Sequence, residues 1–114
     1  MREKTLKEYT EEIVEVFKSY EQIGTTPWNY SIAARDLTYQ LGSLTKILLQ
    51  LEGSRYAKGK TEKELKIDLA DELADILAET LFIAHDMNIS LDEAWNRMRA
   101  SDEKKIQERT ASKQ

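Results

Sequence analysis

The stretch ELKIDLADELADILAETLFIA, residues 64–84, constrains the fold of this chain more than any other segment. It is a long run of good helix formers without glycine or proline. On a helical wheel, one wide and largely apolar arc consists of Leu69, Ala70, Leu73, Ala74, Ile76, Leu77, Thr80, Leu81 and Ala84. A narrow line on the remaining side carries the carboxylates of Asp68, Glu72, Asp75 and Glu79. A helix with so wide an apolar arc is predicted to be central, with neighbours on several sides.

The acidic line has two interpretations. Like charges four residues apart destabilise a helix by about 0.2–0.5 kcal/mol per pair, and Asp68/Glu72 and Asp75/Glu79 are both such pairs. The line is either an ordinary solvated face, or it points into a groove between helices and meets a cation or an ammonium group. Mg²⁺ would suit the groove, because it takes carboxylate oxygens and keeps several waters. The central position predicted for the helix favours the groove.

Composition narrows the class of protein. A chain of 114 residues predicts one domain, and few glycines, one proline and few β-branched runs predict an all-α fold. The net charge of −4 argues against a nucleic-acid partner. The absence of cysteine excludes disulfides and thiolate metal sites, and a single histidine argues against a histidine zinc site. Without a signal-peptide core or an apolar run of about 18 residues, we expect no membrane partner and a cytoplasmic location.

Four helices are predicted along the chain. The first covers residues 4–22 and is ended by the connector 23–30, and the second covers residues 31–52, ending at Gly53. Capping boxes of the form T-x-x-E and S-x-x-E start the third helix at Thr61 and the fourth at Ser90, and Asn88 follows the end of the third. The domain is expected to span residues 1–101. The polar tail, residues 102–114, should fray or be disordered unless a partner holds it.

The second helix has two contrasting sides. Its apolar ridge is formed by Ala34, Leu37, Leu41, Leu44, Leu48 and Leu51. The opposite stripe is formed by Asp36, Tyr39, Gln40, Ser43, Lys46 and Gln50. This stripe is polar but nearly uncharged at its centre, which is unusual for a fully exposed face. Gly42 costs about 1 kcal/mol relative to alanine, so we expect another helix to approach closely there.

Three further features have a structural and a functional interpretation. Trp28, beside the proline turn, either covers a small core or stacks on a flat ligand such as a base. The basic loop 53–61, with Arg55, Lys58 and Lys60, is either solvated or closes over an anionic ligand. His85 falls on the apolar arc, which predicts a packed core histidine.

Three segments resemble the MazG-like, all-α family of nucleoside triphosphate pyrophosphatases. Glu72-Leu-Ala-Asp75 is similar to the family's E-x-x-D motif, MNISLDEA at 87–94 to its turn into the next helix, and LTYQLGSLTK at 37–46 to its first metal-binding helix. The resemblance covers roughly residues 28–98. It implies a four-to-five-helix bundle with two central antiparallel helices, Mg²⁺- or Mn²⁺-dependent hydrolysis of a nucleoside triphosphate to monophosphate and pyrophosphate, and a homodimer or homotetramer.

The family's first helix carries three acids in an E-E-x-x-E motif, and this chain lacks all of them. The positions are occupied by Tyr39, Gln40 and Ser43. Glu72 and Asp75 remain as metal ligands. Gln40, Asp36, Asp68 and Glu79 are candidates to complete the set, and Lys46 is a candidate to neutralise the acids in place of a metal.

The sequence therefore leaves two functions open. The first is a pyrophosphohydrolase whose metal site has fewer acids than the family's. The sequence does not identify a catalytic residue for it. Its candidate substrate-binding residues are Trp28, Lys46, Arg55, Lys58 and Lys60. The second is a catalytically inactive relative that acts as a nucleotide-binding, protein-interaction or oligomerisation module. Acids that all pointed into bulk solvent, away from residues 36–50, would exclude the proposed pocket.

Overall fold

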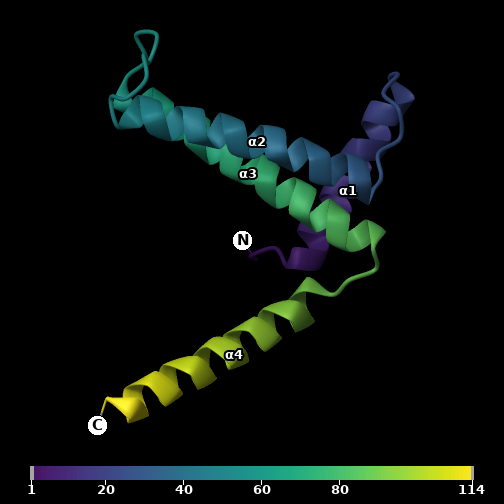
Figure 1. Ribbon diagram of the computed structural model, residues 1–114. Helices are drawn as coiled ribbons and strands as arrows, with labels where there is room; N and C mark the ends of the chain where they lie inside the picture. The colour runs from purple at the N-terminus through teal and green to yellow at the C-terminus, as the bar shows by residue number, and fades with distance from the viewer. Residues whose placement is uncertain (1, 114) are drawn as a thin grey trace.

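The computed structural model describes residues 2–113, which form four α-helices and no strand (Figure 1). The helices are α1 (Leu6–Gln22), α2 (Tyr30–Leu51), α3 (Glu62–Asp86) and α4 (Leu91–Ser112). The predicted all-α class is confirmed, and the four predicted helices are present.

Side-chain caps set where the helices begin. Thr61 Oγ1 accepts a hydrogen bond from the Glu64 amide at 3.1 Å, and Glu64 Oε1 accepts one from the Thr61 amide at 3.2 Å, which confirms the capping box that starts α3. At α4, Ser90 accepts from the Glu93 amide at 3.3 Å, while no return bond from Glu93 is recorded in the described part of the chain, so this predicted box is half formed. Asn88 follows α3 with a φ of 55°, as predicted.

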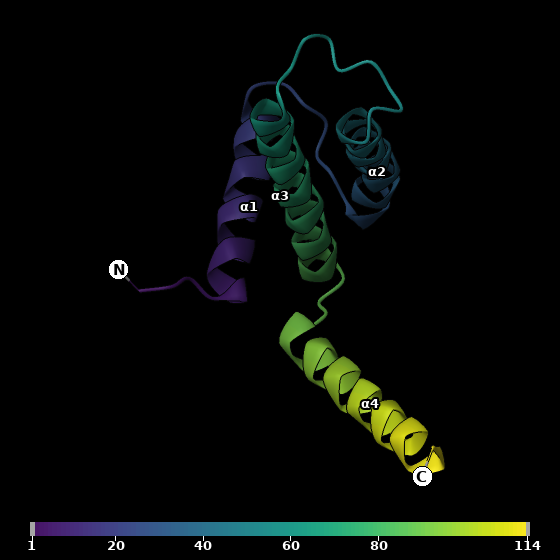
Figure 2. The same cartoon turned by 90° about the vertical axis from the view of Figure 1, so that its left-hand side faces the viewer.

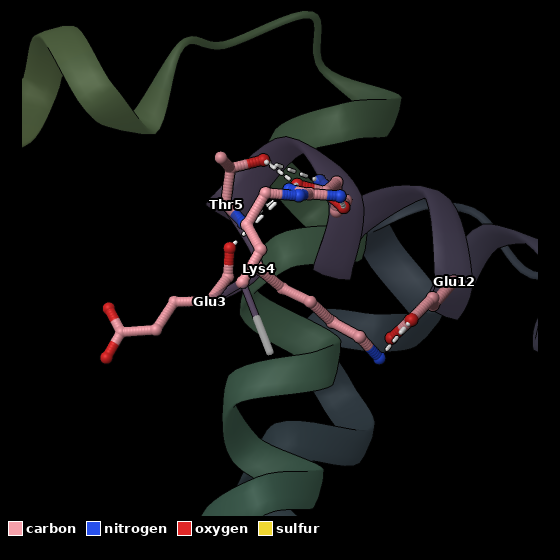
Figure 3. A network of polar contacts seen from close by, with 6 residues as sticks. Glu3, Lys4, Thr5 and Glu12 are labelled. Carbon is pink, nitrogen blue, oxygen red and sulfur yellow. Dashed lines mark hydrogen bonds and ion pairs between the residues drawn. The ribbon is translucent and has the colours of Figure 1, made fainter.

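The N-terminal extension is held onto α1 by charged side chains (Figure 3). Arg2 donates to both carboxylate oxygens of Glu8, at 2.6 and 2.9 Å, and Lys4 pairs with Glu12 at 2.5 Å. The hydrogen bond from Arg2 is the main reason that the pKa of Glu8 is lowered to about 2. These groups are exposed, so the pairs add little to overall stability.

Helix α3 lies between α1 and α2 (Figure 2). It packs most extensively against α2 and next against α1. The chain reverses at the loop that follows α2, so α2 and α3 lie side by side and run in opposite directions (Figure 1). The acidic helix is therefore in the middle of the packed part of the chain, where its wide apolar arc finds neighbours on two sides.

The core is small and continues into an aromatic contact at one end of α3. Its buried apolar side chains are Ala33, Ile47, Leu65, Leu81, Phe82 and Ala84. Phe17 of α1 lies with its ring centroid 4.5 Å from that of Phe82 and 5.4 Å from that of Trp28. Trp28 thus packs edge-on against the core, and this contact favours the covering role over ligand stacking.

Helix α4 projects from the packed part of the chain (Figures 1 and 2). None of its residues, 91–112, is buried, and Trp95 is 60% exposed. The tail expected to fray or be disordered after Asp102 instead forms the second half of this helix.

Two local predictions are wrong. His85 is exposed rather than packed in the core, and it lines an open cleft between the start of α1 and residues 88–92. The reason is that the apolar arc of α3 is wider than the area its two neighbours cover. No helix approaches Gly42, since a Cβ placed there would have open space within 4 Å.

Removing the cap at Thr61 should weaken the start of α3. Thr61→Ala is expected to lower the free energy of unfolding by about 1 kcal/mol, because one of the unpaired amides of the first turn loses its acceptor. Urea unfolding followed by circular dichroism measures the change. The matched control is Thr38→Ala, at an exposed position within α2, where no loss and at most a gain of about 0.5 kcal/mol is expected, because alanine is the better helix former. Equal losses in both variants would contradict the role of the cap.

Candidate functional site

The side of α2 that faces α3 combines part of its polar stripe with part of its leucine ridge, since Leu37, Leu44 and Leu51 are half-buried. Gln50 is 8% exposed, and Asp36 and Gln40 are half-buried. Leu41 and Leu48 of the ridge are 50% and 41% exposed. Gln40 and Ser43 at the centre of the stripe are half-buried, a position that favours uncharged side chains.

The deepest polar cluster consists of Asp36 and Gln40 from α2 and Glu79 from α3. Gln40 Nε2 donates to Asp36 Oδ2 at 3.2 Å. Glu79 is 5% exposed, and its Oε2 is buried without a hydrogen-bond partner. Burial first, and the neighbouring Asp36 second, raise the pKa of Glu79 to about 8. Glu79 is therefore mostly protonated at neutral pH, which relieves the repulsion between the two carboxyl groups.

A cleft of about 370 Å³ lies between α2 and α3 nearer the loop that joins them. Its charged lining consists of Lys46, Lys58, Lys60, Asp68, Asp71 and Glu72, and its other lining residues are Tyr39, Ser43, Ile47 and Gln50. Gln50 Nε2 donates to the carbonyl oxygen of Tyr56 at 3.1 Å, which ties the basic loop to α2. The loop thus brings two of its lysines to the acidic side of α3.

The charges in the cleft are only partly paired. Lys60 Nζ lies 2.5 Å from Asp68 Oδ2, and this hydrogen bond is the main reason that the pKa of Lys60 is raised. Glu72 has a buried Oε2 without a hydrogen-bond partner. Burial, followed by the charges of Asp75 and Asp71, raises the pKa of Glu72, and the charge of Lys46 opposes the increase. Within residues 2–113, no salt bridge joins Lys46 to a carboxylate, so its influence on Glu72 acts at longer range.

The six candidate metal ligands do not form one set. Asp36, Gln40 and Glu79 make the deep cluster, Asp68 and Glu72 line the cleft, and Asp75 is exposed. Over the described residues, no group of three or more Asp, Glu or His side chains is placed to hold a metal ion. The acids nevertheless do not all face bulk solvent, since Glu79 is buried and Glu72 is half-buried against α2.

The carboxylates near the cleft suit a divalent ion held by one or two protein ligands better than an ion held by protein ligands alone. Mg²⁺ in nucleotide sites is commonly held by one or two carboxylates, with waters and substrate phosphates completing its shell. The unpartnered oxygen of Glu72, with Asp75 about one turn away on α3, can supply such a pair. The buried Oε2 of Glu72 has no hydrogen-bond partner, and this observation supports binding of a cation beside it.

The candidate substrate-binding residues are divided in the same way. Lys46, Lys58 and Lys60 meet in the cleft, while Arg55 is exposed and does not line it. Trp28 packs on Phe17, away from the cleft. The sequence did not single out Asp71 or Tyr39 as cleft residues. Asp71 lies three residues from Asp68 and could have been found from helical spacing, whereas Tyr39 was noted as a member of the polar stripe and as a replaced acid.

No known protein family, characterised protein or solved structure matches this chain. None of the helices within residues 2–113 combines the length and the apolar character that a membrane crossing requires.

Proposed function

We propose that the cleft between α2 and α3 binds a nucleoside triphosphate and that the chain is a divergent MazG-like pyrophosphohydrolase dependent on Mg²⁺ or Mn²⁺. The observation that carries the proposal is the meeting of three lysines with the unpartnered carboxylate oxygen of Glu72 in one cleft. A triphosphate carries about four negative charges, so ammonium groups and a carboxylate-bound metal ion both favour its binding. The resemblance of residues 28–98 to the family supports the same reaction.

Each residue has a distinct proposed role. Lys46 and Lys58 bind phosphate oxygens, and Lys60 does so after releasing Asp68. Glu72 and Asp75 hold the ion, with Asp36, Gln40, Asp68 and Glu79 as auxiliary acceptors. The bound ion would screen the phosphate charge and activate a water. Ser43 and Tyr39, which also line the cleft, lie where a ribose or base could contact them.

The hydrolase proposal predicts a measurable loss in Glu72→Gln. Purified protein is incubated with a panel of nucleoside triphosphates and Mg²⁺ or Mn²⁺, and released pyrophosphate is measured. The variant should turn over at least about tenfold more slowly, because the ion loses an anionic ligand. Glu108→Gln, an exposed change on α4, should leave the rate unaltered. Turnover equal in the wild type and Glu72→Gln would overturn the proposal.

A second candidate is a catalytically inactive relative that binds nucleotide without hydrolysing it. It is favoured by the replacement of three family acids with Tyr39, Gln40 and Ser43, and by the division of the remaining acids into two groups. Thermal unfolding distinguishes the two. A rise in melting temperature with nucleotide but not with metal favours the inactive relative, whereas a metal-dependent rise that disappears in Asp75→Asn favours the hydrolase.

The resemblance also supports two broader proposals. We propose that the chain acts in the cytoplasm and that it assembles as a homodimer or homotetramer. The large apolar side chains left exposed on all four helices support the assembly.

A further inference from the structure

The described chain is more open than a compact monomer of its size. Its accessible surface is 9110 Å², whereas a compact protein of 13.2 kDa exposes about 6,400 Å². Its radius of gyration is 18.4 Å, against about 13 Å for a compact chain of this length. The projecting α4 contributes to both differences, but the packed helices also leave apolar surface uncovered.

Part of the uncovered apolar surface of the packed helices lies on one side of the α2/α3 pair. Leu41 and Leu48 of α2 are 50% and 41% exposed, and Leu73 and Leu77 of α3 are 52% and 48% exposed. We call these four residues the leucine face. On α2 they are seven residues apart, and on α3 four residues apart, so each pair lies along one line of its helix.

The two lines turn to the same side of the helix pair. On α2 the two leucines lie about a quarter of a turn around the helix axis from the side that contacts α3. On α3 the two leucines lie a quarter of a turn or slightly more from the side that contacts α2, and the rotation has the same sense on both helices. Because α2 and α3 run in opposite directions, equal rotations bring the two lines together. The cleft residues Lys46 and Asp71 lie nearly opposite the leucines of their helices, so the leucine face and the cleft are on opposite sides of the pair.

We propose that a second copy of this chain covers the leucine face with its own leucine face. A two-fold interface requires a surface that complements itself, and two flat pairs of antiparallel helices form a four-helix layer when placed face to face. The ridge of α2 from Ala34 to Leu51 carries no charge. On α3 the line continues to Lys66, seven residues before Leu73, and Lys66 is paired with Glu62 at 3.2 Å, so two copies can approach without burying an unpaired charge.

The exposed area of the chain is compatible with this occupant. A stable interface needs about 800 Å² from each partner, and this chain exposes roughly 2,700 Å² more than a compact protein of its mass, part of it on the projecting α4. The inference rests on the proposed homo-oligomer and names its surface, but it does not depend on nucleotide chemistry. It leaves the cleft open to a ligand.

Light scattering and single charge insertions test the inference on the full chain. At micromolar concentration, the wild type should have at least twice the 13.2 kDa mass of one chain. Leu73→Glu and Leu48→Glu should each reduce that mass by at least twofold. Ile67→Glu is the matched control, because Ile67 is 55% exposed on α3 and lies outside the leucine face, and it should retain the wild-type mass. Circular dichroism checks that each variant keeps its helices.

Cross-linking keeps the inference testable if a glutamate variant unfolds. The chain has no cysteine, so Leu41→Cys, Leu48→Cys and Leu73→Cys can be cross-linked one at a time with a bifunctional maleimide. Covalent dimers are expected from these variants and not from Ile67→Cys. A monomeric wild type would overturn both the oligomer and its surface. If the oligomer persists in both glutamate variants and the leucine-face cysteines give no cross-link, the chain is an oligomer but the leucine face is not its interface.

Discussion

Replacing Glu79 with glutamine is expected to stabilise the protein in alkaline solution and to change its stability little in mild acid. Glu79 is 5% exposed and faces Asp36 and Gln40 of α2, with Asp75 one turn away on α3. Its pKa is raised from 4.5 to about 8, chiefly by burial, so the folded state holds a proton that the unfolded state releases. Glutamine keeps the size and a hydrogen-bond donor but carries no charge at any pH.

The direction of the pH effect follows from proton linkage. Between pH 4.5 and about 8 the folded state binds more protons than the unfolded state, so wild-type stability falls as the pH rises, and the full loss is reached above pH 8. The shift sets an upper bound of about 5 kcal/mol for this loss. Urea unfolding in chelator-containing buffers across this range should show a much flatter profile for Glu79→Gln. Glu108→Gln, an exposed control, should follow the wild type, and parallel profiles for all three proteins would refute the prediction.

Phe82→Ala should be the most destabilising core substitution among the aromatic residues, with a loss of about 3–5 kcal/mol in the free energy of unfolding. Phe82 is 7% exposed, and its ring lies 4.5 Å from that of Phe17, which in turn contacts Trp28. The truncation would leave a cavity where α1 and the connector meet α3. Urea unfolding measures the loss, and Ile106→Ala, at a 62% exposed site on α4, should cost less than about 0.5 kcal/mol.

The fluorescence of Trp28 gives a second measurement of the same substitution. In a Trp95→Phe background, Trp28 is the remaining tryptophan of the sequence, so its emission reports on the aromatic contact. Phe82→Ala should shift the emission to longer wavelength as Trp28 becomes more exposed to water. An unshifted spectrum with wild-type stability would show that the aromatic contact does not hold α1 in place.

Local patterns were sufficient to predict the helices. The apolar spacing of residues 64–84 and the Thr61 capping box depend on neighbours within four residues, and both are found as predicted. The central position of α3 also follows from the width of its apolar arc. These predictions concern one helix at a time.

Predictions that required knowing which helices meet were less accurate. The sequence pattern separated a leucine ridge from a polar stripe on α2, but the side that packs on α3 combines members of both, since Gln50 is buried and Leu44 is half-buried. His85 was placed in the core because a wheel does not show how much of an arc the neighbours cover. The pairing of Glu79 with Asp36, rather than with the other acids of α3, depends on the relative position of two helices and could not be read from spacing.

The placement of α3 between its neighbours has a consequence for the order of assembly. Helices α1 and α2 each dock mainly on α3, so neither has its principal surface to bind until α3 has formed. The α2/α3 pair is joined directly by residues 52–61, whereas contact between α1 and α3 closes a longer stretch of chain that includes all of α2 and costs more chain entropy. Helix α1 can therefore detach while α2 and α3 remain packed together. Among these three helices, we expect α1 to unfold first and to dock last during folding.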